Sequence, residues 1–277
     1  MTEQFLTVNG LRLRIIEWGD PGLPTLFLLH GFSSTAIAWA NVAEACAGRY
    51  HVVALDQRGH GASEWDPHGR YSIDDFVADA HDVSQQLGLA PFVLVGHSMG
   101  GSIAYTYAAM HPQDVTRLVI EDAAPRPVDD PRPPIQPLPE APVFASRDEV
   151  VASVRAAQPL MAQDALERRV DVYYVERPDG TWSFRADVAR VRTAIAQRPT
   201  YDWLWAHVRN IKCPTLVLRA GQEPAAISEQ TIDLLREANP RVEVVTVPEA
   251  GHNIHFAHFA AFMPLLEQFL AEPASVS

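Results

Sequence analysis

The sequence predicts an α/β fold built on a mostly parallel, eight-stranded sheet with helices on both faces. Short strand patterns alternate with helix patterns along most of the chain. Later strands such as Thr25–Leu29 are near-continuous apolar runs, which is typical of parallel strands that are buried on both faces. With 277 residues, 47% of them hydrophobic, the chain is long enough to bury one large core.

The chain is expected to begin with a hairpin. Asn9-Gly10 is a strong turn signal, and it stands between strand patterns at Phe5–Val8 and Leu11–Trp18. Ser72 favours the start of a helix through Leu87, because its side chain can cap the first turn. The other expected strands are Thr25–Leu29, His51–Leu55, Val93–Val95, Thr116–Ile120, Thr215–Leu218 and Val242–Val247, and the other helices are Ala36–Ala47, Ser102–Ala109, Ser228–Ala238 and Phe262–Ala271.

The alternation is interrupted between residues 125 and 209. Eight prolines from Pro125 to Pro142 exclude a helix or a central strand there. Helical patterns follow at Arg147–Ala156 and Asp164–Val175, and Asp179-Gly180 indicates a turn before aromatic residues. We therefore expect a cap of residues 125–209 over a core of residues 1–124 and 210–277, the alternative being a proline-rich surface excursion. Its aromatic residues could line a pocket or fill a core, so none is assigned a role.

Charge and composition narrow the partners. Twenty-two basic and 34 acidic side chains give a net charge of −12, and the basic residues are scattered. This argues against nucleic acid or a membrane as a partner. Cys46 and Cys213 lack metal-ligand spacing, so we expect no metal, no disulfide framework and no cofactor. The N-terminus has no signal-peptide pattern and no apolar stretch approaches ~20 residues, so a cytoplasmic protein is expected.

The most informative motif is Gly96-His97-Ser98-Met99-Gly100. It follows a β-branched strand and precedes a helical stretch, which is the context of a nucleophile elbow. In such a turn Ser98 has strained backbone angles, and the two glycines avoid a collision across it. An ordinary strand–helix turn is the alternative.

Two further segments supply what a serine nucleophile requires. Thr25–Leu29 leads into His30-Gly31-Phe32, where backbone N–H groups of Phe32 and Met99 would form an oxyanion hole. We expect His30 itself to hold this loop by hydrogen bonds. After the last strand, Gly251-His252 places a histidine downstream of the serine, so His252 is the expected general base.

With these motifs in hand, the chain resembles the α/β-hydrolase family over nearly its whole length. Residues 56–63 look like the family's Asp-x-Arg-Gly-x-Gly-x-Ser turn, whose charged residues are expected to be structural. Residues 179–185 are similar to the Asp-Gly hairpin in the lid of capped serine carboxylesterases. The resemblance implies the α/β-hydrolase fold with a helical cap inserted after the sixth strand.

The triad acid departs from the usual pattern. Most family members carry Gly-x-x-Asp after the strand that corresponds to Thr215–Leu218, but here Pro224 stands where that aspartate would be. Some members carry the acid one strand earlier, and by that resemblance we expect Asp122 to orient His252. Glu223 and Glu121 stay open as alternatives, although Pro224 restricts the backbone of Glu223.

The resulting expectation is a serine carboxylesterase that cleaves esters of small apolar acyl groups through a Ser98–His252–Asp122 triad and an acyl-enzyme. A lactonase with the same triad and a slow-turnover ligand receptor are the alternatives. A serine at position 98 disfavours the dehalogenase and epoxide hydrolase chemistries of the fold, which need a carboxylate nucleophile. The expected partner is a small-molecule ester, and a homodimer stays open.

Overall fold

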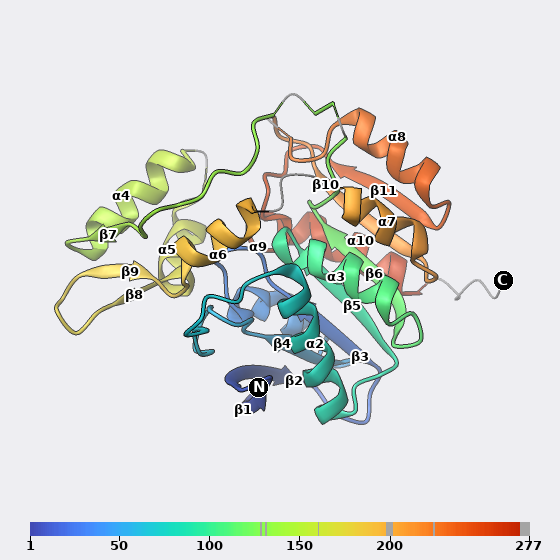
Figure 1. Cartoon of the computed structure of the whole chain (residues 1–277), viewed down its shortest axis with the longest axis horizontal. Coiled ribbons are helices and arrows are strands. Elements are labelled where there is room, and N and C mark those ends of the chain that lie inside the picture. The colour runs from blue at the N-terminus through green and yellow to red at the C-terminus, as the bar shows by residue number, and fades with distance from the viewer. Residues whose placement is uncertain (128, 131, 160, 198–201, 224, 272–277) are drawn as a thin grey trace.

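A computed structural model of the chain describes residues 1–127, 129–130, 132–159, 161–197, 202–223 and 225–271. Its centre is an eight-stranded sheet in the order β1-β2-β4-β3-β5-β6-β10-β11 (Figure 1). β2 is antiparallel to both of its neighbours, and the strands from β4 to β11 pair in parallel. The predicted fold class is confirmed. The strands of this sheet are β1 (Thr2–Val8), β2 (Leu11–Trp18), β3 (Thr25–Leu29), β4 (His51–Leu55), β5 (Phe92–His97), β6 (Val115–Glu121), β10 (Thr215–Ala220) and β11 (Val242–Val247).

Helices cover both faces because side chains alternate along the buried strands. Phe27 and Leu29 of β3 pack in one apolar core, and Leu26 and Leu28 pack in the other. The first core is covered by α2 (Ile73–Leu87), α3 (Met99–Met110), α7 (Asp202–Asn210) and α8 (Glu229–Ala238). The second is covered by a 3₁₀ turn (Ala36–Trp39), α1 (Ala40–Cys46), α9 (Ile254–Ala257) and α10 (Phe259–Ala271).

Local signals in the sequence explain where several elements begin. Asn9 and Gly10 have φ of 48° and 82°, as the predicted two-residue hairpin requires. Ser72 accepts a hydrogen bond from the Asp75 N–H while the Asp75 side chain accepts from the Ser72 N–H, so α2 begins with a complete capping box. One expected helix is divided, since the chain from Ala36 forms a 3₁₀ turn before α1.

The insertion between β6 and α7, which is called the cap below, lies at one end of the molecule (Figure 1). Its elements are β7 (Val143–Phe144), α4 (Arg147–Ala157), α5 (Gln163–Tyr173), β8 (Tyr174–Glu176), β9 (Trp182–Phe184) and α6 (Val188–Ala196). α4 and α5 share an apolar cluster that includes Val150, Leu166 and Val170. The cap also holds a small sheet in the order β7-β9-β8, which the expected helical cap lacked. The helix expected to continue to Val175 ends earlier, because Tyr174 already pairs with Phe184.

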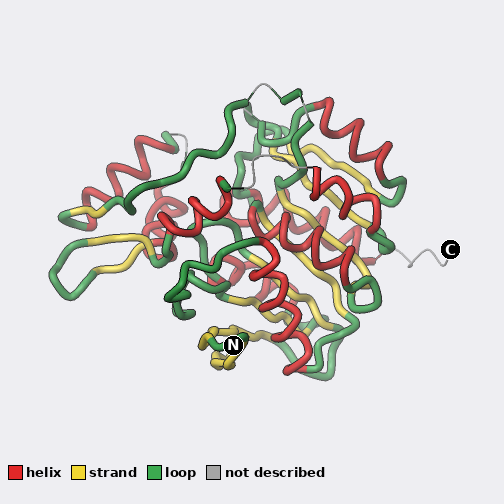
Figure 2. The backbone as a smooth tube through the Cα atoms, in the orientation of Figure 1, coloured by secondary structure: helices red, strands yellow, loops and turns green. Residues whose placement is uncertain are grey.

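The two ends of the insertion differ in structure from its middle. Figure 2 shows the described part of the proline-rich stretch as loop, in agreement with its composition. Pro131, one of those prolines, lies outside the described residues. At the other end, Leu204, Trp205 and Val208 of α7 are buried in the same apolar core as residues of α2 and α3. This last helix therefore packs as part of the core layer, although it lies within the expected cap range.

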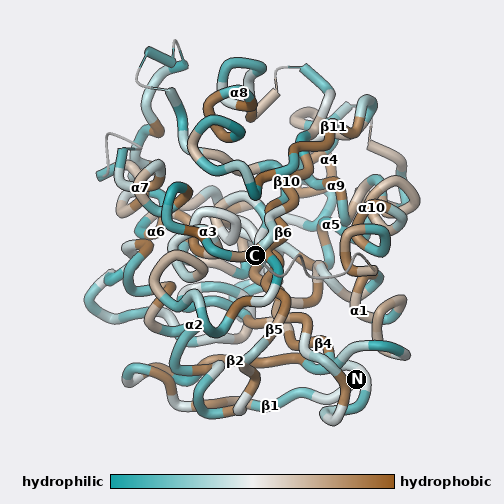
Figure 3. Tube along the Cα trace, turned by 90° about the vertical axis from the view of Figure 1, so that its right-hand side faces the viewer, coloured by the Kyte–Doolittle hydropathy of each residue, from teal (hydrophilic) through white to brown (hydrophobic). Residues whose placement is uncertain are grey.

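Hydrophobic residues run along the middle strands of the sheet, most visibly β5, β6 and β10 in Figure 3. The apolar surface is thus concentrated between the helix layers. In the part of the chain that the structure describes, no helix is both long and apolar enough to cross a membrane.

Candidate active site

Ser98 lies on the sharp turn between β5 and α3. Its backbone has φ 52° and ψ −114°, which is a strained conformation for a residue with a side chain. A Cβ on Gly96 would lie 2.3 Å from the Gly100 carbonyl oxygen, and one on Gly100 would lie 2.4 Å from the Leu29 carbonyl oxygen. Both flanking positions therefore require glycine, and the Ser98 hydroxyl stands at the start of α3.

Ser98, His252 and Asp122 form one hydrogen-bonded row. Ser98 Oγ donates to Nε2 of His252 at 2.9 Å, and Nδ1 of His252 donates to Oδ2 of Asp122 at 2.6 Å. The other carboxylate oxygen of Asp122 accepts from the Ala220 backbone N–H at 3.0 Å. The Asp122 side chain is buried, whereas that of His252 is 45% exposed. A buried carboxylate in this position fixes the orientation and tautomer of the imidazole.

Asp122 is aimed by the end of β6. Its φ is 46°, and its backbone N–H donates to the Leu218 carbonyl oxygen at 2.8 Å. The chain therefore stays attached to β10 while it turns away from the sheet. This local bend presents the carboxylate to the loop that carries His252.

The two rival carboxylates face other groups. Glu121 accepts from Nδ1 of His255 at 2.7 Å and from the His255 backbone N–H at 3.1 Å. The Glu223 side chain is 75% exposed, lies 3.8 Å from Arg219, and accepts from the Ala225 N–H. Pro224, which was expected to restrict Glu223, lies outside the described residues.

The expected oxyanion donors flank the serine. Phe32 and Met99 both line the same cavity as Ser98. Met99 is the first residue of α3, so its N–H belongs to the four that lack a partner within a helix. Gly31 brings the Phe32 loop close, because a Cβ there would lie 2.6 Å from Nδ1 of His97. Both positions thus border the space beside Ser98 in which the oxyanion of a serine reaction forms.

His30 holds this loop, as its position predicted. Its Nδ1 donates to the Gly31 carbonyl oxygen at 2.8 Å, and its Nε2 accepts from the Gln57 N–H at 3.1 Å. An accepting Nε2 requires the neutral ring, and burial lowers the pKa of His30 to about 4. In the following turn, Asp56 accepts from the backbone N–H groups of Ala36 and Ala62. These contacts show structural roles for His30 and Asp56.

Arg58 and His60 in that turn also form hydrogen bonds with other residues of the chain. Arg58 makes a two-pronged contact with Asp79, with nitrogen–oxygen distances of 2.5 and 2.6 Å. His60 Nδ1 donates to the Arg58 carbonyl oxygen at 2.9 Å. Burial, followed by the nearby His30, lowers the pKa of His60 to about 3.

A second acid–histidine pair, Glu121 with His255, lies next to the first. Its two side chains are 0% and 1% exposed, and the His255 ring stacks on Trp39 with centroids 3.8 Å apart. His97 lies against both histidines, with centroids 4.9 Å from His252 and 5.2 Å from His255. Its Nε2 donates to the His252 carbonyl oxygen at 2.8 Å. Nothing in the local sequence around His255 indicates its pairing with Glu121, which lies 134 residues away.

A cavity of about 500 Å³ opens over Ser98 and is shared between core and cap. The core contributes Phe32, Ser98 and His252, while α5 contributes Arg169 and Tyr173. α6 adds Arg192, Ala194 and Ile195, and Trp203 of α7 also lines the wall. The insertion thus lines the same cavity as Ser98, His252 and Asp122, and it contributes arginines that the sequence did not indicate as site residues.

Backbone and side-chain hydrogen bonds tie the cap to the core beside this cavity. Gly61 N–H donates to the Arg185 carbonyl oxygen, and Asp187 N–H donates to that of Gly59, both at 2.8 Å. Tyr173 donates through its hydroxyl to Asn253, the neighbour of His252, at 3.4 Å. The cap position is therefore linked to the loop that carries the histidine.

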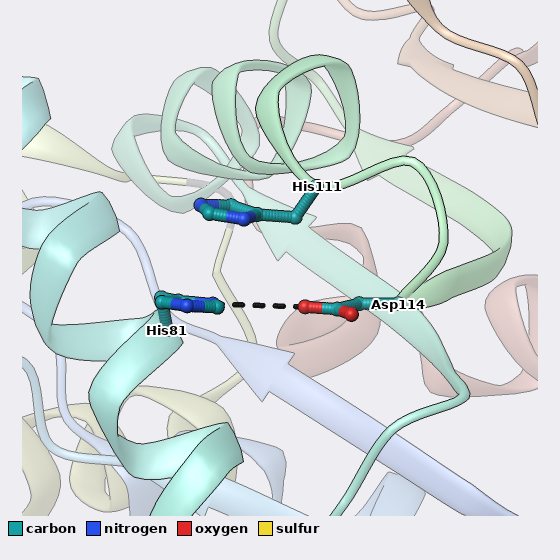
Figure 4. A group of neighbouring side chains, drawn as sticks. All are labelled: His81, His111 and Asp114. Atoms are coloured by element: carbon teal, nitrogen blue, oxygen red, sulfur yellow. Dashed lines mark ion pairs between the residues drawn. The ribbon is translucent and has the colours of Figure 1, made fainter.

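A separate group of potential metal ligands lies between the second half of α2 and the C-terminal end of α3. His81, His111 and Asp114 have ligand atoms within 4.8 Å of one another (Figure 4). The two imidazoles stack with centroids 3.9 Å apart, and His81 lies 3.6 Å from the Asp114 carboxylate. Tyr107 donates to Asp114 at 2.9 Å. Sequence spacing gave no sign of this cluster, because the fold assembles it from distant segments, and none of its residues lines the described wall of the cavity.

Comparison with known proteins places the chain among related sequences. A family model described as the alpha/beta hydrolase family matches residues 26–264. N-formylmaleamate deformylase of Pseudomonas putida is 28% identical over 97% of this chain and 96% of its own length. A putative 2-succinyl-6-hydroxy-2,4-cyclohexadiene-1-carboxylate synthase of Bacillus subtilis is 26% identical over 95% and 96%. Epoxide hydrolase 4 of Mus musculus is 36% identical, but this match spans 40% of the chain and only 32% of that protein.

Solved structures show the same fold at lower identity. E-2-(acetamidomethylene)succinate hydrolase superposes with a TM-score of 0.82 at 23% identity, covering 98% of this chain and 99% of the other. A thioesterase domain from the curacin biosynthetic pathway also gives 0.82 at 23% identity, over 97% and 99%. These likenesses concern the arrangement of the chain and not its substrate.

Proposed function

This chain belongs to the alpha/beta hydrolase family, and we propose that it is a serine hydrolase that cleaves carboxylic esters through Ser98, His252 and Asp122. The observation that carries the proposal is the hydrogen-bonded row of these three side chains, with distances of 2.9 and 2.6 Å. It lies at the floor of a cavity of about 500 Å³, a volume within the range of small-molecule sites.

The first half of the reaction follows from the proton positions. A serine hydroxyl is a weak nucleophile at neutral pH, so Nε2 of His252 takes the proton of Ser98 Oγ as this oxygen attacks the ester carbonyl. Asp122 stabilises the imidazolium that forms and keeps Nδ1 protonated. Backbone N–H groups of Phe32 and Met99 then stabilise the oxyanion of the tetrahedral intermediate. His252 returns the proton to the alcohol, which leaves an acyl group on Ser98.

The second half regenerates the enzyme. His252 takes a proton from a water molecule, and the resulting hydroxide attacks the acyl carbonyl. The tetrahedral intermediate collapses, the carboxylic acid leaves, and Ser98 recovers its proton from His252. The half-exposed His252 side chain supports this step, because the base must reach water as well as the serine.

The nucleophile Ser98 also distinguishes the proposed reaction from epoxide hydrolysis. A partial match to an epoxide hydrolase covers 113 residues, but epoxide opening in this fold uses a carboxylate nucleophile. Here the strained turn carries a hydroxyl. We therefore propose an acyl-enzyme route rather than an alkyl-enzyme route.

Active-site labelling tests the proposal directly. A fluorophosphonate probe should label the wild-type protein on Ser98, as located by peptide mass spectrometry, and p-nitrophenyl esters should be turned over many times. Ser98→Ala should abolish both. Ser102→Ala is the matched control, because Ser102 also lines the cavity, and it should retain labelling. Labelling of another serine, or ester turnover that survives in Ser98→Ala, would refute the assignment.

A further inference from the structure

The cavity over Ser98 is lined by more basic than acidic side chains, although the protein as a whole is acidic. Four arginines line it, namely Arg126, Arg132, Arg169 and Arg192. Asp122 is the one carboxylate among its described lining residues, and that carboxylate is occupied by His252 and the Ala220 N–H. The whole chain carries a net charge of −12, so the positive charge is specific to the site. A cavity of this kind concentrates anions.

Three of these arginines have described structural partners within the chain. Arg132 contacts Asp130 with nitrogen–oxygen distances from 2.5 Å. Arg126 donates to the Pro133 carbonyl oxygen at 2.8 Å, and Arg192 donates through Nε to the Gln136 carbonyl oxygen at 2.9 Å. These contacts order the loop that leads into the cap.

Arg169 differs from the other three. Its Nη1 is buried and has no hydrogen-bond partner among the residues that the structure describes. The guanidinium lies over the Tyr173 ring, 4.3 Å from the centroid, and both residues come from α5 on the cavity wall. A buried guanidinium nitrogen without an acceptor is costly to the free protein. Arg169 as a whole is only partly buried and lines the cavity, so an anion that enters the cavity can approach its guanidinium.

We propose that the substrate carries a carboxylate in addition to the scissile ester, and that Arg169 binds this carboxylate. The inference rests on the ester hydrolysis proposed above and specifies its substrate class. The guanidinium lies over the Tyr173 ring, and its fork of N–H groups suits the two oxygens of a carboxylate. Phe32, Ile135 and Ile195 also line the cavity, so an apolar chain can connect the ester to the carboxylate.

Paired esters of equal size test the charge preference. On the acyl side, mono-p-nitrophenyl adipate is compared with p-nitrophenyl 6-methylheptanoate, in which a branched alkyl end replaces the carboxylate. On the alcohol side, the butyrate ester of 4-hydroxybutanoate is compared with that of 4-methylpentan-1-ol. In at least one pair, kcat/KM for the charged ester should exceed that of its neutral partner by about 10- to 100-fold, the range of one charge-assisted hydrogen bond.

Substitution of Arg169 tests whether this residue causes the preference for the charged ester. Arg169→Met should remove this preference, mainly by raising KM for the charged ester. For the neutral ester kcat/KM should change by less than about threefold, which shows that the site is still folded. Arg169→Lys should retain part of the preference. Arg168→Met is the matched control, because Arg168 is exposed on the same helix and pairs with Asp164, and it should leave the ratio unchanged. No preference in either pair, or equal losses for both members in Arg169→Met, would overturn the proposal.

A binding measurement separates this inference from the proposed reaction. Calorimetry on the full chain should show that adipate binds at least tenfold more tightly than neutral adipamide, and Arg169→Met should abolish the difference. This result is expected even if no ester is hydrolysed, in which case only the proposed reaction fails. Equal binding of adipate and adipamide, or tighter binding of inorganic phosphate than of adipate, would contradict a carboxylate site at Arg169.

Discussion

Glu121 and Asp122 are neighbours in sequence, and their carboxylates bind two different histidines. Glu121 accepts a hydrogen bond from His255 and Asp122 accepts one from His252. The positive φ at Asp122 separates the two side chains at the end of β6. Two acid–histidine pairs therefore lie side by side, but only the Asp122 pair extends to Ser98.

The first prediction concerns the acid of the row. Asp122→Asn should lower kcat by about 10³- to 10⁴-fold, because an amide no longer selects the tautomer with a proton on Nδ1. Glu223→Gln should cost less than about tenfold, since that side chain is exposed and bonds to Ala225. The measurement is kcat with a p-nitrophenyl ester, with circular dichroism as the check on folding.

Reversal of that ranking would transfer the role to Glu223. Comparable large losses in both variants would indicate that the two carboxylates support His252 together, which the described contacts do not predict.

The second prediction concerns the buried pair. Glu121→Gln should lower the free energy of unfolding by about 2 kcal/mol, because it weakens a charge-assisted hydrogen bond to His255 in a fully buried setting. Burial, the largest influence, raises the pKa of Glu121, but the neighbouring His255 and His97 and the hydrogen bonds from His255 together lower this pKa below its usual value. The effect on kcat should stay below about tenfold. Urea denaturation and steady-state kinetics on the same preparation measure both quantities.

Glu243→Gln is the control, because Glu243 is exposed on β11, and it should leave stability unchanged. If Glu121→Gln instead reduced kcat as much as Asp122→Asn with little loss of stability, the pair would act in the reaction and not in the fold.

The third prediction concerns stability below neutral pH. Burial lowers the pKa of His30 to about 4 and those of His60 and His97 to about 3, whereas an unfolded histidine titrates near 6.5. Between these values the unfolded chain binds protons that the folded chain excludes. The contribution to stability is therefore complete above pH 6.5 and is lost as the pH falls towards 4 and then 3. Each group contributes a slope of up to about 1.4 kcal/mol per pH unit.

Urea unfolding at pH 7.5, 6.0 and 5.0 measures this loss. His60→Asn should reduce the slope between pH 6.0 and 5.0 by about 1 kcal/mol per unit, while His68→Asn, at an exposed position, should not. Stability that is constant between pH 7.5 and 5.0 would show that the three buried rings do not control acid unfolding.

Much of the fold was accessible from the sequence because its signals are local. Apolar strands such as Thr25–Leu29, the Asn9-Gly10 turn and the Ser72 cap each specify their own element. The small sheet of the cap was missed, since strands of two or three residues such as β7 and β8 have too few alternations to recognise. α7 was missed for a different reason: its burial depends on packing against a distant core.

The same distinction between local signals and packing applies to the residues of the site. Ser98 and His252 stand in short motifs whose geometry follows from nearby glycines and strand ends, and the resemblance to relatives suggested Asp122. Arg169 gave no local signal, because a helix in the cap brings it over the serine only in the folded chain. The pairing of Glu121 with His255 likewise needs the approach of two segments 134 residues apart.

The last prediction concerns metals. The reaction of Ser98, His252 and Asp122 needs no metal ion, because its protons move only between side chains, water and the leaving alcohol. Treatment with EDTA followed by dialysis should therefore leave kcat/KM unchanged.

The cluster of His81, His111 and Asp114 offers three ligand atoms within 4.8 Å, but none of its residues is among the described residues that line the cavity. Burial, together with the neighbouring His81, lowers the pKa of His111, which keeps this ring neutral. Any added Zn²⁺ that binds there should therefore raise the melting temperature without changing kcat, and His111→Ala should remove that stabilisation while ester turnover stays within about twofold. Loss of turnover on chelation, with recovery on adding Zn²⁺ back, would show that a metal takes part in the reaction; if His111→Ala prevented this recovery, it would locate the metal in the cluster.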